Sequence, residues 1–260
     1  MRHDMTIDGR VLSYLDFGGP GRPLLALHGG LSEGAHYAGL ATALGDDWRV
    51  IAPDQRGHGD SDRAAEYSRE GYVGDLVALL DHLGRQDPLP VLGFSLGGLN
   101  AYHLAAARPD LVSALINVDG PVERPSGKGP NLFDFVARLP YTAPTREELL
   151  AACGPMGEGL AAGLRPLPDG SGWRLPFHPQ DTLATVDSGS GEHWDVWTAS
   201  RCPALLIHGL RSQALPQRQA DAMVARRPGT SYVGLDTEHY VPFQDPKGFH
   251  DAVAAFLQTL

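Results

Sequence analysis

The sequence has few cysteines, and this scarcity argues against a disulfide-linked protein and against a cysteine-ligated metal site. Only Cys153 and Cys202 occur in 260 residues, and their spacing is not typical of metal ligands. A disulfide framework is therefore excluded, and we predict neither a metal ion nor another cofactor. We interpret both thiols as small buried side chains.

Positive charge and long apolar runs are also scarce. The chain carries 21 Lys and Arg against 31 Asp and Glu, a formal net charge of -10, which makes nucleic acid or an anionic membrane an unfavourable main partner. No stretch approaches the roughly 18 apolar residues of a membrane span, and the first residues lack the apolar core of a signal peptide. We expect a cytoplasmic protein that acts on a small molecule, while its oligomeric state is unknown.

What the sequence does contain is a regular alternation of two patterns. A turn dipeptide, Asp8-Gly9, predicts an N-terminal β-hairpin. Five short apolar runs then suit strands buried on both faces, and helical patterns lie between them. These runs are residues 23–27, 49–52, 90–93, 114–118 and 204–207, with a further short strand at 231–235 before an amphipathic helix at the C-terminus. The succession predicts an α/β fold with a mostly parallel, doubly wound sheet.

Residues 121–200 differ from the rest of the chain because they are rich in Gly, Pro and Ser. We interpret residues 1–120 and 201–260 as one core domain and 121–200 as an insertion. Helices are expected at 132–139 and 146–152, the second with Thr145 and Glu148 as a capping box. Aromatic residues of the insertion either line an apolar pocket or pack it on the core; they are Phe133, Phe135, Tyr141, Trp173, Phe177, Trp194 and Trp197.

A candidate nucleophile follows the third of these buried strands. The pentapeptide Gly93-Phe94-Ser95-Leu96-Gly97 stands between that strand and an Ala-rich helical stretch, the context of a nucleophile elbow. Such a sharp turn strains the serine backbone and brings neighbouring main chain close, so glycine is needed two residues before and after the serine. We predict that Ser95 is the nucleophile.

Four motifs in this order resemble the α/β-hydrolase superfamily. His28-Gly29-Gly30 is similar to its oxyanion loop, residues 54–61 to the turn after its next strand, Gly93–Gly97 to its elbow, and His239 stands in the loop before the last helix. The resemblance implies a serine, acid, histidine order along the chain, which makes His239 the general base. It also implies that 121–200 is a partly helical cap over the nucleophile.

The resemblance also assigns the groups that stabilise negative charge during attack. Leu96 and Gly30 are expected to donate backbone N–H groups to the oxyanion, with Leu31 as the alternative to Gly30. We interpret His28 as an anchor of its loop and residues 54–61 as a tight turn beneath the site, in preference to direct catalysis by His58.

The triad acid is where the sequence departs from the family pattern. Ser212 stands where most relatives carry an aspartate, after the strand at 204–207. Some members draw the acid from the end of the preceding strand, and Asp119 ends the strand at 114–118. We therefore predict Asp119 as the acid, against a role as a turn cap, and prefer it to Asp236 and Glu238 near His239.

These residues indicate a serine hydrolase that forms an acyl-enzyme on a carboxylic ester or lactone, with cleavage of a carbon–carbon bond also open. A second interpretation is a lyase or cyclase that uses the same pocket without hydrolysis. A third is a receptor without catalysis built on the same fold.

Overall fold

The computed structural model describes residues 1–124 and 132–260, and its centre is one eight-stranded sheet. The strand order is β1-β2-β4-β3-β5-β6-β12-β13, with β1 and β2 antiparallel and the strands from β4 onward parallel. The strands are β1 (Arg2–Ile7), β2 (Arg10–Asp16), β3 (Arg22–Leu27), β4 (Trp48–Pro53), β5 (Leu89–Phe94), β6 (Val112–Val118), β12 (Ala204–Gly209) and β13 (Thr230–Leu235). The predicted fold class and hairpin are confirmed.

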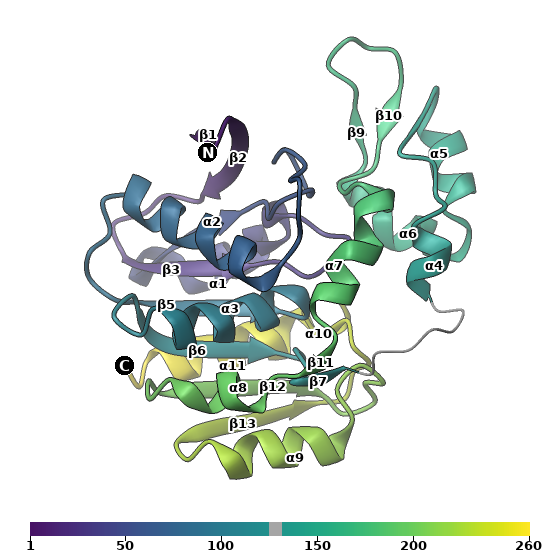
Figure 1. Ribbon diagram of the computed structural model, residues 1–260. Helices are drawn as coiled ribbons and strands as arrows, with labels where there is room; N and C mark the ends of the chain where they lie inside the picture. The colour runs from purple at the N-terminus through teal and green to yellow at the C-terminus, as the bar shows by residue number, and fades with distance from the viewer. Residues whose placement is uncertain (125–131) are drawn as a thin grey trace.

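Helices cover both faces of this sheet (Figure 1). One apolar cluster joins the sheet to α2, α3, α8 and α9, and a second joins its other face to α1 and α11. The central parallel strands are buried on both sides, as their unbroken apolar runs predict, whereas the edge strand β13 is only partly buried. The helices are α1 (Ala38–Leu44), α2 (Arg69–His82), α3 (Leu96–Ala107), α8 (Trp194–Ala199), α9 (Gln217–Arg226), α10 (Val241–Gln244) and α11 (Pro246–Leu257).

Short elements fill the chain between β6 and β12. In Figure 1, α4 to α7 lie beyond the end of the sheet toward which the parallel strands point. The elements are β7 (Glu123–Arg124), α4 (Leu132–Val136), β8 (Thr142–Ala143), α5 (Arg146–Ala152), α6 (Gly157–Leu160), β9 (Arg165–Pro166), β10 (Trp173–Arg174), α7 (Thr182–Ser188) and β11 (Gly191–Glu192). Single turns of 3-10 helix occur at Gly34–Tyr37, Gly45–Asp47, Gly154–Met156, Ala161–Gly163 and Pro179–Asp181.

The predictions for this segment are only partly met. Helix α5 has the expected bounds and its capping box is formed, whereas α4 ends at Val136 and a turn follows. Helix α8 packs on α3 through Trp197, so this end of the segment contacts the core. Residues 125–131 of the predicted cap lie outside the described residues, and the division into core and cap stays a prediction.

Within residues 1–124 and 132–260, every helix is too short or too polar to cross a membrane.

Candidate functional site

A large open cavity lies at the carboxyl ends of the parallel strands, between the sheet and the segment 121–200. Its volume is about 1440 Å³, and both Ser95 and His239 line it. Ligands of open α/β sheets bind outside the carboxyl ends of the strands, so the position is that expected of an active site.

Ser95 stands at the sharp junction of β5 and α3. Its φ of +53° and ψ of -112° are strained for a residue with a side chain. A Cβ on Gly93 would lie 2.1 Å from the carbonyl oxygen of Gly97, and one on Gly97 would lie 2.0 Å from that of Leu27. The predicted need for glycine at both positions is therefore confirmed, and the turn leaves the Ser95 side chain facing the cavity.

The structure brings the three predicted triad residues into one hydrogen-bonded chain. His239 Nε2 accepts a hydrogen bond from Ser95 Oγ at 2.8 Å, and its Nδ1–H donates to Asp119 Oδ2 at 2.7 Å. His239 comes from the loop between β13 and α10, and Asp119 follows the last residue of β6. The Asp119 carboxylate is fully buried, and its other oxygen accepts the Gly209 backbone N–H at 2.9 Å. Asp236 and Glu238 are both exposed, and no such bond to His239 is present for either among the described residues.

Ser212 is a polar partner of this chain that the sequence alone did not assign. Its Oγ–H donates to Asp119 Oδ2 at 2.5 Å, the same oxygen that accepts from His239. The hydroxyl in turn accepts the backbone N–H groups of Ala214 and Leu215 at 3.2 Å. The signal for this contact was present, because Ser212 occupies the place from which most relatives aim a carboxylate at the same histidine.

The two predicted oxyanion donors lie at the edges of the same cavity. Leu96 is the first residue of α3, so its N–H is one of the four that a helix leaves without an internal partner. Gly30 follows β3, and a Cβ there would meet no heavy atom within 4 Å, so its backbone borders open space. Leu31, the alternative, also lines the cavity and has a φ of +66°. The assignment of these donors stays a prediction.

The residues beneath the site form the structural turn that we expected. His28 is buried; its Nε2 accepts the Gln55 N–H at 2.9 Å, and the Gln55 side chain donates to the His28 carbonyl at 2.7 Å. These bonds tie the two loops together, which confirms His28 as an anchor. Burial lowers the pKa of His28 well below its usual value, and burial also lowers that of His58, so both rings are neutral near pH 7.

Pocket lining and packing on the core were both open for the aromatic residues of the segment, and most of them do not line the cavity. Of the seven, Phe133 is the one found in the cavity wall among the described residues, while Trp197 is buried against α3. Aliphatic residues of the wall include Leu31, Leu99, Leu183 and Val186, and the core adds the aromatic residues Phe94 and Tyr240. Cys153 is buried as expected, but Cys202 is only half-buried. In the described ranges, no three His, Cys, Asp or Glu side chains are grouped as metal ligands would be.

Comparison with known proteins shows the family of the chain. Residues 22–246 match the model of the alpha/beta hydrolase fold family. The chain is 30% identical over 263 residues to a 3-hydroxybutyrate-oligomer hydrolase of Cupriavidus necator, covering 90% of this chain and 89% of that protein. It is 36% identical over 183 residues to the lipase LipV of Mycobacterium tuberculosis, covering 66% and 68% respectively.

Solved structures agree with the fold. A marine microorganism esterase superposes with a TM-score of 0.81 at 24% identity, covering 96% of this chain and 99% of that one. Fold, residue order and sequence similarity thus agree, and the chain belongs to the α/β-hydrolase family.

Proposed function

We propose that the protein is a serine hydrolase that cleaves a small-molecule carboxylic ester or lactone through an acyl-enzyme. The observation that carries the proposal is the unbroken chain from Ser95 Oγ through both nitrogens of His239 to the buried Asp119 carboxylate, opening into a cavity. The names of the two relatives, a 3-hydroxybutyrate-oligomer hydrolase and a lipase, support an ester as the substrate.

The first half-reaction follows from the direction of these hydrogen bonds. Ser95 Oγ attacks the carbonyl carbon as its proton passes to His239 Nε2, and Asp119 stabilises the imidazolium through Nδ1–H. The carbonyl oxygen becomes an oxyanion that accepts from the N–H groups of Leu96 and Gly30. The tetrahedral centre then expels the alkoxide, which takes the proton from Nε2 and leaves as an alcohol.

The second half-reaction repeats these steps with water. His239 Nε2 takes a proton from water as the hydroxide oxygen bonds to the acyl carbon, and the oxyanion forms again at the same donors. Ser95 Oγ leaves and recovers its proton from Nε2, releasing the carboxylic acid. No group other than water is consumed.

A fluorophosphonate probe tests the activated serine directly. We expect one covalent adduct by intact mass, lost in Ser95→Ala and retained in Ser190→Ala, a serine of the same cavity. If the folded wild-type protein takes no label, the proposal fails, and the result supports a non-hydrolytic lyase, a cyclase or a receptor instead. A panel of esters, lactones and a β-diketone then separates ester cleavage from carbon–carbon cleavage.

A further inference from the structure

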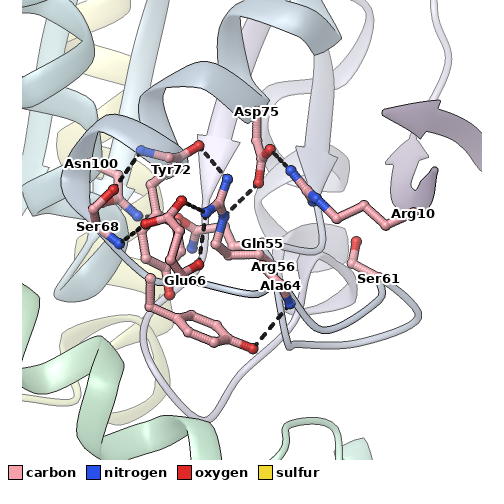
Figure 2. A network of polar contacts seen from close by, with 12 residues as sticks. Arg10, Gln55, Arg56, Ser61, Ala64, Glu66, Ser68, Tyr72, Asp75 and Asn100 are labelled. Carbon is pink, nitrogen blue, oxygen red and sulfur yellow. Dashed lines mark hydrogen bonds and ion pairs between the residues drawn. The ribbon is translucent and has the colours of Figure 1, made fainter. Parts of the chain in front are cut away.

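Two arginines beside the cavity have no carboxylate partner within residues 1–124 and 132–260, unlike their neighbour Arg56. Figure 2 shows Arg56 held between two carboxylates, with Nε 2.8 Å from Asp75 and Nη1 2.6 Å from Glu66. Its charge is therefore balanced inside the fold. No ion pair with a carboxylate is formed by Arg69 or Arg124 in the part of the chain that the structure describes.

Arg69 is buried with neutral acceptors alone in the described part of the chain. It is 5% exposed, and it donates to the Asn100 side chain, to Ser188 Oγ at 2.6 Å and to the Thr185 carbonyl at 3.3 Å. Burial lowers the pKa of this guanidinium, and the positive charge of Arg124 lowers it further. A guanidinium nevertheless stays protonated at neutral pH. Its charge therefore lies uncompensated directly behind Thr185, which lines the cavity.

Arg124 faces the cavity itself. It is half-buried, and no carboxylate of the described residues lies within 4 Å of it, while residues 125–131 contain no Asp or Glu. The position of a Cβ on Gly189 would lie 3.0 Å from Arg124 Nη1 and 2.9 Å from Leu99 Cδ2, so the guanidinium adjoins Leu99. Leu99 follows Ser95 by four residues in α3, a rise of about 6 Å. Leu99 therefore has Ser95 one turn before it and the Arg124 guanidinium near its side chain.

Asp134 also lines the cavity and is half-buried, and the remaining charged groups of the wall are paired or exposed. Arg211 pairs with Asp236, and Arg138 is exposed at the rim. Among the acids, Asp181 pairs with Arg63 at 2.6 Å, and Glu123 accepts from the Trp194 indole at 2.5 Å. Asp187 and Glu238 are exposed to solvent. Within the described residues, Arg124 is thus the cation best placed to receive a negative group from a ligand.

We propose that Arg124 binds a free carboxylate on the acyl part of the substrate, so that the preferred substrate is a half-ester or lactone of a dicarboxylic acid. This substrate class rests on the proposed hydrolase function. A guanidinium presents paired N–H donors that match a carboxylate, and the partly desolvated cavity strengthens the ion pair. Arg69 adds positive potential from behind the wall. The apolar Leu99 between Ser95 and Arg124 suits a short hydrocarbon link between the scissile carbonyl and the carboxylate.

The kinetic test compares ethyl hydrogen succinate with its neutral isostere, ethyl 4-methylpentanoate. We expect wild-type kcat/KM to favour the anion, and Arg124→Gln to lower the anion-to-neutral ratio by roughly 10- to 100-fold, the usual effect of a hydrogen-bonded charge pair. Arg124→Lys keeps the charge but loses the paired N–H donors of the guanidinium, and its anion-to-neutral ratio is expected to lie between those of the wild type and Arg124→Gln. Arg138→Gln removes an equal charge from the rim and is expected to change the ratio less than about threefold. A wild-type preference for the neutral ester, or an equal ratio in Arg124→Gln and Arg138→Gln, overturns the proposal.

A binding test separates this proposal from the hydrolase function. Calorimetry with succinate on Ser95→Ala needs no turnover; we expect binding, weakened roughly 10-fold or more in Ser95→Ala/Arg124→Gln. If succinate binding depends on Arg124 but the wild-type protein has no esterase activity, the proposed function is wrong and the carboxylate-binding role of Arg124 stands. If the protein has esterase activity but succinate binding does not depend on Arg124, only the carboxylate-binding role of Arg124 is wrong. Equal melting temperatures of the variants exclude loss of fold as the cause.

Discussion

The α/β core and the segment 121–200 hold their side chains in position by different means. In the core, long buried strands and backbone contacts place Ser95, His239 and Asp119 within 2.8 Å of their partners. The segment is built from short helices and two-residue strands, with a small apolar cluster of its own. It contacts the core partly through ion pairs such as Arg165–Asp60 at 3.0 Å and Arg63–Asp181 at 2.6 Å. The proposed chemistry therefore depends on the core, and the segment contributes half of the residues that line the cavity.

The largest expected effect of this difference is at the triad acid. We expect Asp119→Asn to lower kcat by about 10³- to 10⁴-fold on an activated ester, because an amide no longer stabilises the imidazolium or the required tautomer. Asp187→Asn, in the segment, and Glu238→Gln, near His239, are expected to change kcat less than about threefold. Near-normal turnover by a folded Asp119→Asn protein would show that Asp119 is not the triad acid.

The second effect concerns glycines of the two regions. In Gly97→Ala the new Cβ would lie 2.0 Å from the Leu27 carbonyl oxygen, a backbone atom that cannot step aside. We expect the free energy of unfolding to fall by about 3 kcal/mol, together with loss of activity. Gly159→Ala in α6 meets no heavy atom within 4 Å and is expected to change stability by less than about 1 kcal/mol. Urea denaturation of both variants measures this, and equal midpoints would mean that the elbow relaxes freely.

The third effect tests Ser212 as a positioning residue of the core. Removing its hydroxyl in Ser212→Ala deprives Asp119 Oδ2 of a donor, and we expect kcat to fall roughly tenfold with KM little changed. Ser212→Thr restores the hydroxyl and is expected to recover most of the loss, whereas a merely structural defect would not be rescued. Ser190→Ala, in the segment, is the matched control. A normal kcat in Ser212→Ala would limit Ser212 to packing.

The sequence predicted the core better than the segment, because the long buried strands of the core leave a clear pattern in the sequence and the short elements of the segment do not. Buried parallel strands produce unbroken apolar runs, and the elbow needs glycine at two positions, so Ser95 and its strand could be identified from the residues alone. Asp119 followed from the strand end and from the missing acid at residue 212. The vacant acid position drew attention to Ser212, but the sequence does not show that its hydroxyl reaches Asp119 Oδ2, because that contact depends on how the ends of β6 and β12 meet in the fold. The short elements of the segment have no periodicity that shows which side chains face the cavity, so the sequence left open whether its aromatics line the pocket or pack.

The smallest expected effect is a pH dependence of stability that originates in the core. Burial, with the charges of His193 and Arg69, lowers the pKa of His103 to about 4, and its buried Nε2 has no hydrogen-bond partner among the described residues. Above the unfolded value near 6.5 both states are neutral, so His103 adds no pH dependence there. As the pH falls below 6.5, the unfolded chain binds a proton that the folded chain binds only near pH 4, so stability is lost on acidification. We expect His103→Gln to reduce the loss of unfolding free energy between pH 6.5 and 5 by roughly 1 kcal/mol.

His178 in the segment is the control. It is half-buried and stacked on Tyr141, and its pKa is lowered mainly by burial, so His178→Gln is expected to have a smaller effect. Parallel pH profiles of the wild type and His103→Gln would show that this ring is as easily protonated in the fold as in water.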